Sequence, residues 1–541
     1  MTRRAFLETP ALAAAVRRPP NVVILITDDQ GYGDLSIHGN PHLSTPNIDS
    51  IARAGVQFTQ FHVSPVCSPT RASVMTGRYN YRTGVVDTYI GRSLMRPSEV
   101  TLAESFRAAG YRTGIFGKWH LGDNYPMRPI DKGFETAITL RGGGLAQPSG
   151  PPGNGYFDPE LERNGVPERF RGYCTDIYYS EAAAWIERHR RDPFFAYVAT
   201  NAPHEPYQVD DSLAAPFRAK GLADNTAKIY GMVKNIDDNV GRLLSRLRAL
   251  DLERDTVVVF LTDNGPQAAR YNAGMRGIKG AVYEGGIRVP CFLRYPRAVK
   301  AGERVDRLAA HIDLFPTLHE ACGIPAPAGV RIDGRSLWPL ATGRQPRWTD
   351  RSLGFQWHRG DVPVHGRDCA VRDQHYKLVN RKELYDLESD PGESKDVSSE
   401  KPDVVARLRS AYDEWFQDVT AAGFEPARIH LGSPKEPVSI LTRQDRRGAE
   451  EGWGPYSDGW WEVEVERAGR YRIRLRFPAT SSGGAVEFRL GSTSAAADFG
   501  PQSSEVVLER IDLPAGPARV EAHVRAGGRV YGAHYVHVET R

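Results

Sequence analysis

Short apolar segments alternate with segments of helical periodicity over residues 21 to about 423. Apolar segments of strand length lie at residues 21–27 and 257–262, and helical patterns cover residues 176–190, 224–250 and 312–322. Strands that alternate with helices pair in a parallel or mixed sheet, because each helix returns the chain along one face of that sheet. The pattern therefore predicts an α/β domain with a central sheet covered by helices on both faces.

The pattern changes near residue 437. Residues 423–437 are rich in Gly, Pro and charged side chains, which is typical of a linker. Further on, residues 461–466 and 471–477 alternate strictly between apolar and polar side chains, as half-buried antiparallel strands do. We therefore expect a small β-sandwich. The predicted organisation is a terminal segment at residues 1–20, the α/β domain at 21–424, a linker at 425–437 and the sandwich at 438–541, with further strands near 486–490, 506–508 and 530–538.

The charge pattern argues against nucleic acid as a partner, since the formal net charge is only +4 and Lys and Arg form no blocks. No apolar run is long enough to span a membrane. Arg3 and Arg4, followed by an alanine-rich stretch, resemble a twin-arginine export signal and predict a periplasmic or secreted protein. The alternative is a basic tail on a cytoplasmic protein, because the apolar stretch is short and Arg17 and Arg18 follow it.

The five cysteines do not predict a disulfide framework. Their number is odd, their spacings are wide and no Cys-x-x-Cys pair exists. Cys291 and Cys322 have apolar neighbours and are expected to be small buried side chains. Cys67 differs because polar, turn-forming residues surround it in the stretch SPVCSPTRASVMTGRY.

Four predicted strands end in residues that carry chemistry. In open α/β sheets ligands bind at the carboxyl ends of the strands. One Asp or His at such a place commonly caps a helix or makes a single hydrogen bond, but four occurrences at one edge favour a functional site. The residues are Asp28 and Asp29 after strand 21–27, Asp263 and Asn264 after 257–262, Lys118 and His120 after 111–116, and His204 after 194–199.

The acidic residues and the asparagine offer only oxygen ligands, which suit Ca²⁺ or Mg²⁺ and not Zn²⁺. Several protein oxygens in an adaptable shell favour Ca²⁺, because Mg²⁺ keeps its waters in a strict octahedron. Lys118, His120 and His204, with Lys279 from a Gly-flanked loop, supply positive charge and protons. Together these groups predict a pocket for a tetrahedral oxyanion, either phosphate or sulfate.

Cys67 is expected at the N-terminus of a helix. Pro69 suits the first turn, and Gly77 is a suitable C-cap. Backbone N–H groups at a helix start favour negative charge, and Arg71 lies one turn further on the same face. Two other interpretations of Cys67 are open at this stage, a thiol that only packs and a thiolate nucleophile.

The sequence resembles the type I, formylglycine-dependent sulfatases of the alkaline-phosphatase-like superfamily. Residues 67–77 (CSPTRASVMTG) match the family's Cys-x-Pro-x-Arg signature, and residues 117–122 (GKWHLG) match its second signature. Residues 27–34 (TDDQGYGD) and 263–265 (DNG) also match, over a total span of roughly 20–420. The resemblance implies a large domain with a central mixed sheet flanked by helices, and the C-terminal β region lies outside it.

The resemblance implies that a maturation enzyme oxidises Cys67 to Cα-formylglycine. The hydrated aldehyde is a gem-diol: one hydroxyl attacks the sulfur of a sulfate ester, and the second then releases sulfate. Asp28, Asp29, Asp263 and Asn264 would hold calcium with residue 67, and Arg71 and Lys118 would stabilise its hydroxyls. His120 would take a proton, while His204 and Lys279, with Lys118, would bind the sulfate and assist the leaving oxygen.

Two alternatives remain open from the sequence. Phosphonate monoester hydrolases and some phosphodiesterases resemble this fold, but they use Asp-His where this chain has Asp263 and Asn264. A carbohydrate-binding protein on an inactive fold is the second alternative, with sugar stacking on an aromatic cluster that otherwise forms the sandwich core. The cluster consists of Trp453, Tyr456, Trp460 and Trp461. The Gly/Pro-rich segment 142–155 is expected to line the pocket mouth as a mobile loop.

Overall fold

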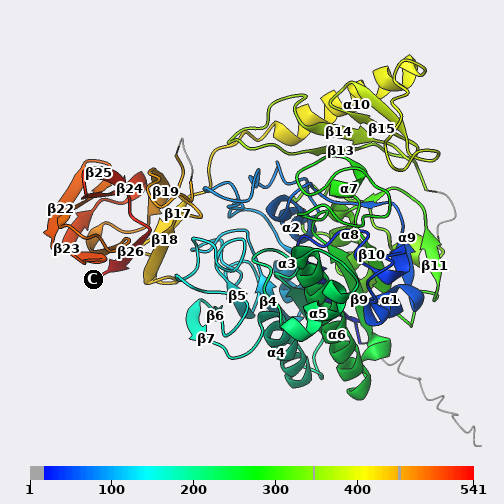
Figure 1. The fold of residues 1–541 in the computed structure, drawn as a ribbon, viewed down its shortest axis with the longest axis horizontal. Coiled ribbons are helices and arrows are strands. Elements are labelled where there is room, and N and C mark those ends of the chain that lie inside the picture. The colour runs from blue at the N-terminus through cyan, green and yellow to red at the C-terminus, as the bar shows by residue number, and fades with distance from the viewer. Residues whose placement is uncertain (1–17, 345–347, 449–451) are drawn as a thin grey trace, which may run out of the picture.

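The computed structural model describes residues 18–344, 348–448 and 452–541. A large α/β body carries a β-sandwich at one end, and a smaller sheet with one long helix lies on another side (Figure 1). The predicted export segment with Arg3 and Arg4 lies outside the described residues. Within the described ranges, no helix combines the length and the apolar character that crossing a membrane requires.

The body is built on a mixed ten-stranded sheet, as the sequence predicted. Its five central strands are parallel, and the strands that extend it on either side include antiparallel ones. In spatial order the strands are β11 (Glu303–Val305), β2 (Val56–Phe58), β10 (Cys291–Arg294), β9 (Thr256–Thr262), β1 (Asn21–Thr27), β8 (Phe194–Ala199), β4 (Arg112–Lys118), β5 (Thr136–Leu140), β6 (Glu160–Arg163) and β7 (Val166–Arg169). A two-stranded sheet pairs β3 (Phe61–His62) with β12 (Ala309–Ala310).

Alternate residues of β1 enter two separate cores, because successive side chains of a strand point to opposite faces. Val22, Ile24 and Ile26 belong to one core, and Val23 and Leu25 to the other. The first core packs against α2 (Cys67–Thr76), α3 (Leu102–Ala108), α8 (Leu314–Cys322) and α9 (Trp338–Ala341). The second packs against α1 (Pro46–Arg53), α4 (Cys174–Arg188) and α6 (Asp224–Ala249), and α5 (Asp211–Ala219) lies on α6.

A second, four-stranded antiparallel sheet follows the main one in the chain. It consists of β13 (Leu353–Gln356), β14 (Cys369–Arg372), β15 (Tyr376–Val379) and β16 (Glu383–Asp386), with α10 (Pro402–Thr420) packed on it. A buried charge cluster fastens this sheet to the main body. Glu284 of α7 (Glu284–Ile287) bonds His62, Lys377 of β15 and Arg372 of β14, at 3.1, 3.2 and 3.4 Å.

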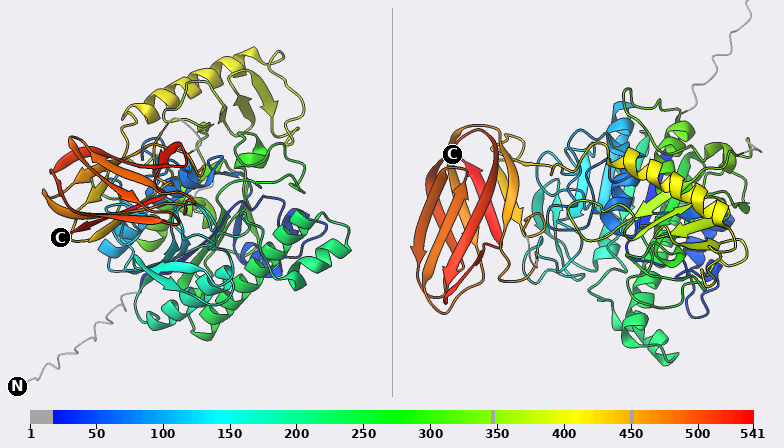
Figure 2. Two further views of the ribbon diagram at one scale, coloured as in Figure 1. Left: turned by 60° about the vertical axis from the view of Figure 1, so that its left-hand side comes forward. Right: turned by 90° about the horizontal axis from the view of Figure 1, so that it is seen from above.

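The C-terminal residues form the predicted sandwich of two mainly antiparallel sheets (Figure 2), which pack around one apolar core. One sheet contains β17 (Ile429–Leu431), β19 (Trp460–Val465), β24 (Gly516–Ala526), β21 (Gly484–Leu490), β22 (Thr493–Phe499) and β25 (Arg529–Gly532). The other contains β18 (Val438–Thr442), β26 (Tyr535–Thr540), β20 (Gly469–Arg476) and β23 (Glu505–Leu513).

Two details of the C-terminal region differ from the sequence-based expectation. The segment expected as a linker contains β17, which pairs in parallel with β19 and so belongs to the sandwich. Residues 530–538 are not one strand, because the chain leaves β25 and crosses to β26 in the other sheet. Gly and Pro around residues 429–431 conceal a three-residue strand, and periodicity alone does not report a crossover between sheets.

Candidate active site

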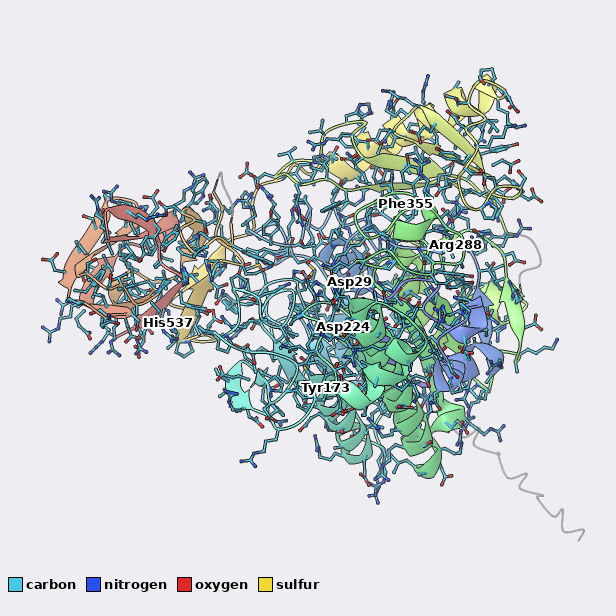
Figure 3. All side chains as sticks on the ribbon, viewed as in Figure 1. Asp29, Tyr173, Asp224, Arg288, Phe355 and His537 are labelled. Atoms are coloured by element: carbon cyan, nitrogen blue, oxygen red, sulfur yellow. The ribbon has the colours of Figure 1, made fainter. Side chains whose placement is uncertain are left out.

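The predicted site residues converge at one edge of the main sheet. β1 pairs in parallel with both β8 and β9, and β4 pairs in parallel with β8, so their carboxyl ends meet. Asp28 and Asp29 follow β1, Asp263 and Asn264 follow β9, Lys118 ends β4, and His120 and His204 lie in the loops after β4 and β8. Asp29 marks this point near the middle of the body (Figure 3).

Backbone geometry at the site is unusual for side-chain-bearing residues. Asp29 and His120 have φ values of 60° and 63°. Residues other than Gly seldom adopt this left-handed region, although Asn, Asp and His do so more often than the rest, and strained backbone of this kind clusters at functional sites. The positive φ values of Asp29 and His120 are therefore consistent with a functional site.

Cys67 is the first residue of α2, as predicted, and Gly77 ends the helix with φ 67°. The Cys67 side chain is buried and its Sγ lies 3.5 Å from His120 Nδ1. The hydroxyl of Ser68 donates to the His120 carbonyl at 2.9 Å, which fixes the helix start against the loop after β4. Residue 67 thus lies directly against the proton-carrying groups.

Arg71 and Lys118 are fully buried cations beside two carboxylates. Arg71 donates to Asp263 Oδ2 through Nε at 3.0 Å and Nη2 at 2.8 Å, and to the Lys118 carbonyl at 3.0 Å. Lys118 Nζ forms an ion pair with Asp28 Oδ2. Burial and the neighbouring Asp28 raise the pKa of Asp263 to about 7, although Arg71 opposes this. Asp263 is therefore less readily ionised than an exposed aspartate.

Asp29 is surrounded by donors. Lys279 Nζ lies 2.6 Å from its Oδ1, Asn264 Nδ2 donates to the same oxygen at 2.8 Å, and His204 Nε2 lies 3.6 Å from Oδ2. Burial alone would raise the pKa of Asp29, but Lys279 and His204 lower it below its usual range. The same pairing raises the pKa of Lys279 although burial opposes it, so both groups are charged.

The donor set fits a hard cation. Asp28 Oδ1 and Asn264 Oδ1 are buried acceptors that find no hydrogen-bond partner among the described residues, and such unpaired oxygens are costly unless a positive group meets them. One ligand atom each of Asp28, Cys67 and Asp263 lie within 4.8 Å of one another, as do atoms of Asp28, Asp29 and His204. Carboxylate and amide oxygens at this spacing could hold a divalent ion such as Ca²⁺.

The two histidines present one basic nitrogen each. His120 Nε2 donates to the Thr88 carbonyl at 2.6 Å, which leaves Nδ1 as the acceptor that faces residue 67. His204 Nδ1 donates to the Glu205 carbonyl at 2.6 Å, which leaves Nε2 toward Asp29. Burial, with Lys118, lowers the pKa of His120 well below 6.5. Burial also lowers the pKa of His204 to about 4, so both rings are neutral near pH 7.

The thiolate interpretation of Cys67 is disfavoured. Burial raises the pKa of the Cys67 thiol more than Lys118 and Lys279 lower it. A reactive cysteine needs the opposite shift, because the thiolate is the nucleophile. An unmodified Cys67 would be an uncharged thiol in the centre of a highly charged site.

Several lining residues were not identified from the sequence. The pocket above Cys67 has a volume of about 250 Å³, and its further lining residues include Thr88, Gln147, Gln267, Trp357, Arg359 and Trp453. Gly143 and Gln147 come from segment 142–155, so the prediction that this segment lines the pocket is confirmed. Arg359 lies over the rings of Tyr89 and Trp357, at 4.5 and 5.0 Å.

The C-terminal region also reaches the site. Gln444 Nε2 donates to the Thr88 carbonyl at 2.9 Å and lies 3.5 Å from His120 Nε2. Trp453 packs edge-on against Tyr89, with ring centroids 5.1 Å apart. No sequence signal links Gln444 to His120, because 324 positions separate them.

The predicted aromatic cluster does not act as one unit. Trp461 is buried in the sandwich core, whereas Trp453 lines the pocket above Cys67. Tyr456 and Trp460 line a separate hollow, where Arg529 and Arg519 cover their rings at 4.7 and 4.8 Å. Only Trp461 therefore fits the core interpretation of this cluster.

Comparison with known proteins agrees with the geometry. A family model described as Sulfatase matches residues 20–324, and one described as N-sulphoglucosamine sulphohydrolase, C-terminal, matches residues 278–417. Human arylsulfatase A is 30% identical over 79% of this chain and 94% of its own length. Human N-acetylgalactosamine-6-sulfatase is 33% identical over 65% of this chain and 70% of its own length.

Solved structures share the fold. Ps i-CgsB in complex with k-i-k-neocarrahexaose superposes with a TM-score of 0.68 at 27% identity, covering 76% of this chain and 95% of that one. The phosphonate monoester hydrolase of Agrobacterium radiobacter has a TM-score of 0.54 at 22% identity, covering 74% of this chain and 96% of that one. At that identity the second likeness concerns the fold alone.

Proposed function

The chain belongs to the sulfatase family of sulfuric ester hydrolases, and from this premise we propose that it hydrolyses aryl or carbohydrate sulfate monoesters with Cα-formylglycine at position 67 and Ca²⁺. The observation that carries the proposal is the position of Cys67. Its Sγ lies at the start of α2, 3.5 Å from His120 Nδ1 and within 4.8 Å of one carboxylate oxygen each of Asp28 and Asp263. An uncharged thiol has no evident use there, whereas an oxygen nucleophile does.

Formylglycine supplies, when hydrated, two hydroxyls on one carbon: one to attack sulfur and one whose deprotonation releases sulfate. The chain's own residues prepare these hydroxyls. The ammonium group of Lys118 favours an ionised oxygen at position 67, and the Arg71 guanidinium adds positive charge from one turn further along the same helix. Nδ1 of His120 is the basic nitrogen nearest residue 67, so it accepts a proton from the side chain of residue 67.

Lys279 and His204 act on the opposite side of the site, beside Asp29. Lys279 binds a sulfate oxygen with its ammonium group. His204 Nε2, once protonated, donates to the ester oxygen as that oxygen leaves as the alcohol, and Asp29, 3.6 Å away, favours this protonated form. Lys118, Cys67 and His204 are all buried, so their charges and protons act in surroundings of lower polarity than bulk water.

Asp28, Asp29, Asp263 and Asn264 would hold Ca²⁺ together with the modified residue 67. The unpaired oxygens of Asp28 and Asn264 support this assignment. A bound divalent ion there would offset the charge of the carboxylates and polarise oxygens of the sulfate group. Ca²⁺ is favoured over Mg²⁺ because every candidate ligand is a protein oxygen.

A maturation enzyme is the partner that this proposal requires. The Cys67 side chain is only 2% exposed in the folded chain. The oxidation at residue 67 therefore takes place before the site closes around it.

Turnover of matched esters tests the proposal. We expect the protein to hydrolyse an aryl sulfate faster than the corresponding aryl phosphate monoester and aryl phosphonate monoester. Cys67→Ala should abolish sulfate release while circular dichroism shows an unchanged fold. Faster turnover of a phosphate or phosphonate ester than of the aryl sulfate would refute the sulfatase assignment. Full activity of Cys67→Ala would exclude residue 67 as the nucleophile.

A further inference from the structure

A basic groove lies next to the active-site pocket, between segment 146–153 and the sandwich. It has a volume of about 510 Å³ and shares Gln147 with the pocket above Cys67. Arg443 lines the groove and donates through Nη1 to the carbonyl of Trp453 at 2.8 Å, and Trp453 lines the active-site pocket. The groove and the catalytic pocket are therefore neighbours that meet at Gln147.

The lining of the groove is cationic. Arg443 and Arg476 lie along it, and its described lining residues include no carboxylate. Arg443 forms no ion pair with a carboxylate within the described ranges; its Nη1 donates to a backbone carbonyl. Arg476 has one long ion pair, with Glu505, whose Oε2 lies 3.8 Å from its Nε. Arg443 is thus free to meet an anion, and Arg476 is only weakly paired.

Two groups beside the groove have lowered pKa values. Burial lowers the pKa of Arg443, although Tyr535 opposes this. Burial, together with Arg443, lowers the pKa of His534 to about 4. A desolvated guanidinium without a carboxylate is costly, and a sulfate or carboxylate group is the partner whose geometry suits it.

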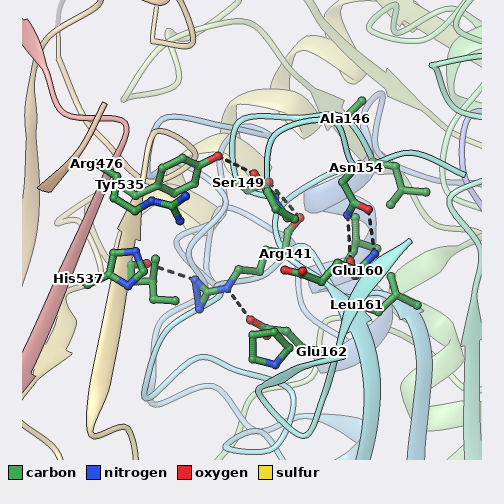
Figure 4. Close-up of a pocket in the computed structure, with 17 residues that line it drawn as sticks. Arg141, Ala146, Ser149, Asn154, Glu160, Leu161, Glu162, Arg476, Tyr535 and His537 are labelled. Atoms are coloured by element: carbon green, nitrogen blue, oxygen red, sulfur yellow. Dashed lines mark hydrogen bonds and ion pairs between the residues drawn. The ribbon is translucent and has the colours of Figure 1, made fainter. Parts of the chain in front are cut away.

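The aromatic side chain of Tyr535 borders the groove, and Arg476 lies over its ring at 5.7 Å. Phe477 contributes to the wall but is only 4% exposed, because it packs in the sandwich core. A smaller hollow of about 190 Å³ adjoins the groove, where Arg476 and Tyr535 again form part of the wall together with Arg141, Glu160 and Glu162 (Figure 4). The Tyr535 hydroxyl donates to the Gly150 carbonyl at 2.6 Å, which ties segment 142–155 to β26.

We propose that this groove binds a sulfated polysaccharide chain that extends from the sulfate ester in the active site, with Arg443 and Arg476 on its anionic groups. The inference rests on the proposed function, because it makes the bound chain an extension of the substrate. It assigns a role to the sandwich, which supplies Arg476 and Tyr535. Saccharide is favoured over other polyanions because the groove adjoins a sulfate-ester site and shares Gln147 with it.

Binding without turnover tests the groove separately from catalysis. The full-length Cys67→Ala protein is run by affinity electrophoresis in gels that contain dextran sulfate, neutral dextran or single-stranded DNA. In that background, Arg476→Glu reverses a charge in the groove. Arg470→Glu reverses one at the other end of β20, where Arg470 is 69% exposed and lies 3.6 Å from Asp512. A thermal melt of each variant checks that it remains folded.

We expect dextran sulfate to retard the protein and neutral dextran not to. Arg476→Glu should weaken dextran sulfate binding about tenfold or more, as expected for one charge-assisted contact replaced by repulsion, and Arg470→Glu less than twofold. Equal losses for the two variants, absence of retardation, or equal retardation by DNA would each overturn the inference. None of these outcomes depends on formylglycine, so a failure here is distinct from a failure to release sulfate.

Discussion

Replacing Lys279 with methionine removes the cation beside Asp29 and keeps most of the side-chain volume. Lys279 Nζ lies 2.6 and 2.8 Å from the two oxygens of Asp29, and the carboxylate is buried. Breaking a buried ion pair from one side costs about 3–5 kcal/mol of unfolding free energy. Asn264 still donates to Asp29 at 2.8 Å, so we expect the lower end, about 3 kcal/mol.

The same change should also slow the chemical step, because Lys279 is expected to donate to negative charge that develops in the transition state. Removing one preorganised donor from a developing oxyanion costs about 10²–10³-fold in kcat. We therefore expect kcat/KM for an aryl sulfate to fall by about 10²–10³-fold in Lys279→Met. Lys279→Arg, which keeps the charge, should lose much less.

Calcium separates the two effects. A bound cation at Asp29 replaces part of the missing positive charge, so the stability loss should shrink when calcium is saturating, whereas kcat/KM should not recover. Urea unfolding with calcium or with chelator measures the first, and initial rates measure the second. Lys300→Met is the control, because Lys300 is 84% exposed. An unchanged kcat/KM would refute the role of Lys279, and a stability loss unaffected by calcium would refute the metal placement.

Three further outcomes follow from the contacts. Gln444→Ala removes a donor to the Thr88 carbonyl that holds His120, so kcat should fall several-fold with little change in KM; equal changes in both would contradict this positioning role. Glu284→Gln should destabilise the protein by about 3–5 kcal/mol at pH 7 in urea unfolding, because Lys377 and Arg372 lose a buried carboxylate. His62 and Lys377 depress the pKa of Glu284 below its unfolded value despite burial. Its contribution to the free energy of unfolding is therefore present above about pH 4.3 and is lost as the pH falls below that value. A difference in unfolding free energy between Glu284→Gln and the unchanged protein that does not vary with pH would contradict this role of the cluster. Chelation should lower activity and the melting temperature together, with Ca²⁺ restoring both better than Mg²⁺; full activity after chelation would exclude a catalytic metal.

Local signals in the sequence were sufficient for the residues at the strand ends. The strands predicted at residues 21–27 and 194–199 coincide with β1 and β8. Parallel pairing then places the residues that follow these strands at one edge, which is why Asp29 and His204 could be predicted to meet. The helix start at Cys67 was equally local, because Pro69 and Gly77 mark its ends.

Contacts between distant segments could not be predicted in this way. Gln444 and Trp453 reach the active site from the sandwich side, and their sequence neighbourhood shows only turn residues and an aromatic cluster. Trp357 and Arg359 lie in the loop that follows β13. This loop belongs to the four-stranded sheet, which the sequence pattern did not distinguish from the main sheet. Such contacts depend on long-range packing, and the periodicity of single strands gives no information about which distant segments pack together.

Mass spectrometry of the peptide that contains residue 67, taken from active enzyme, tests the central claim most directly. The account predicts that this residue has lost H₂S and gained one oxygen relative to cysteine, and that the modified fraction rises in proportion to specific activity across preparations. An unmodified cysteine at position 67 in fully active enzyme would contradict the account.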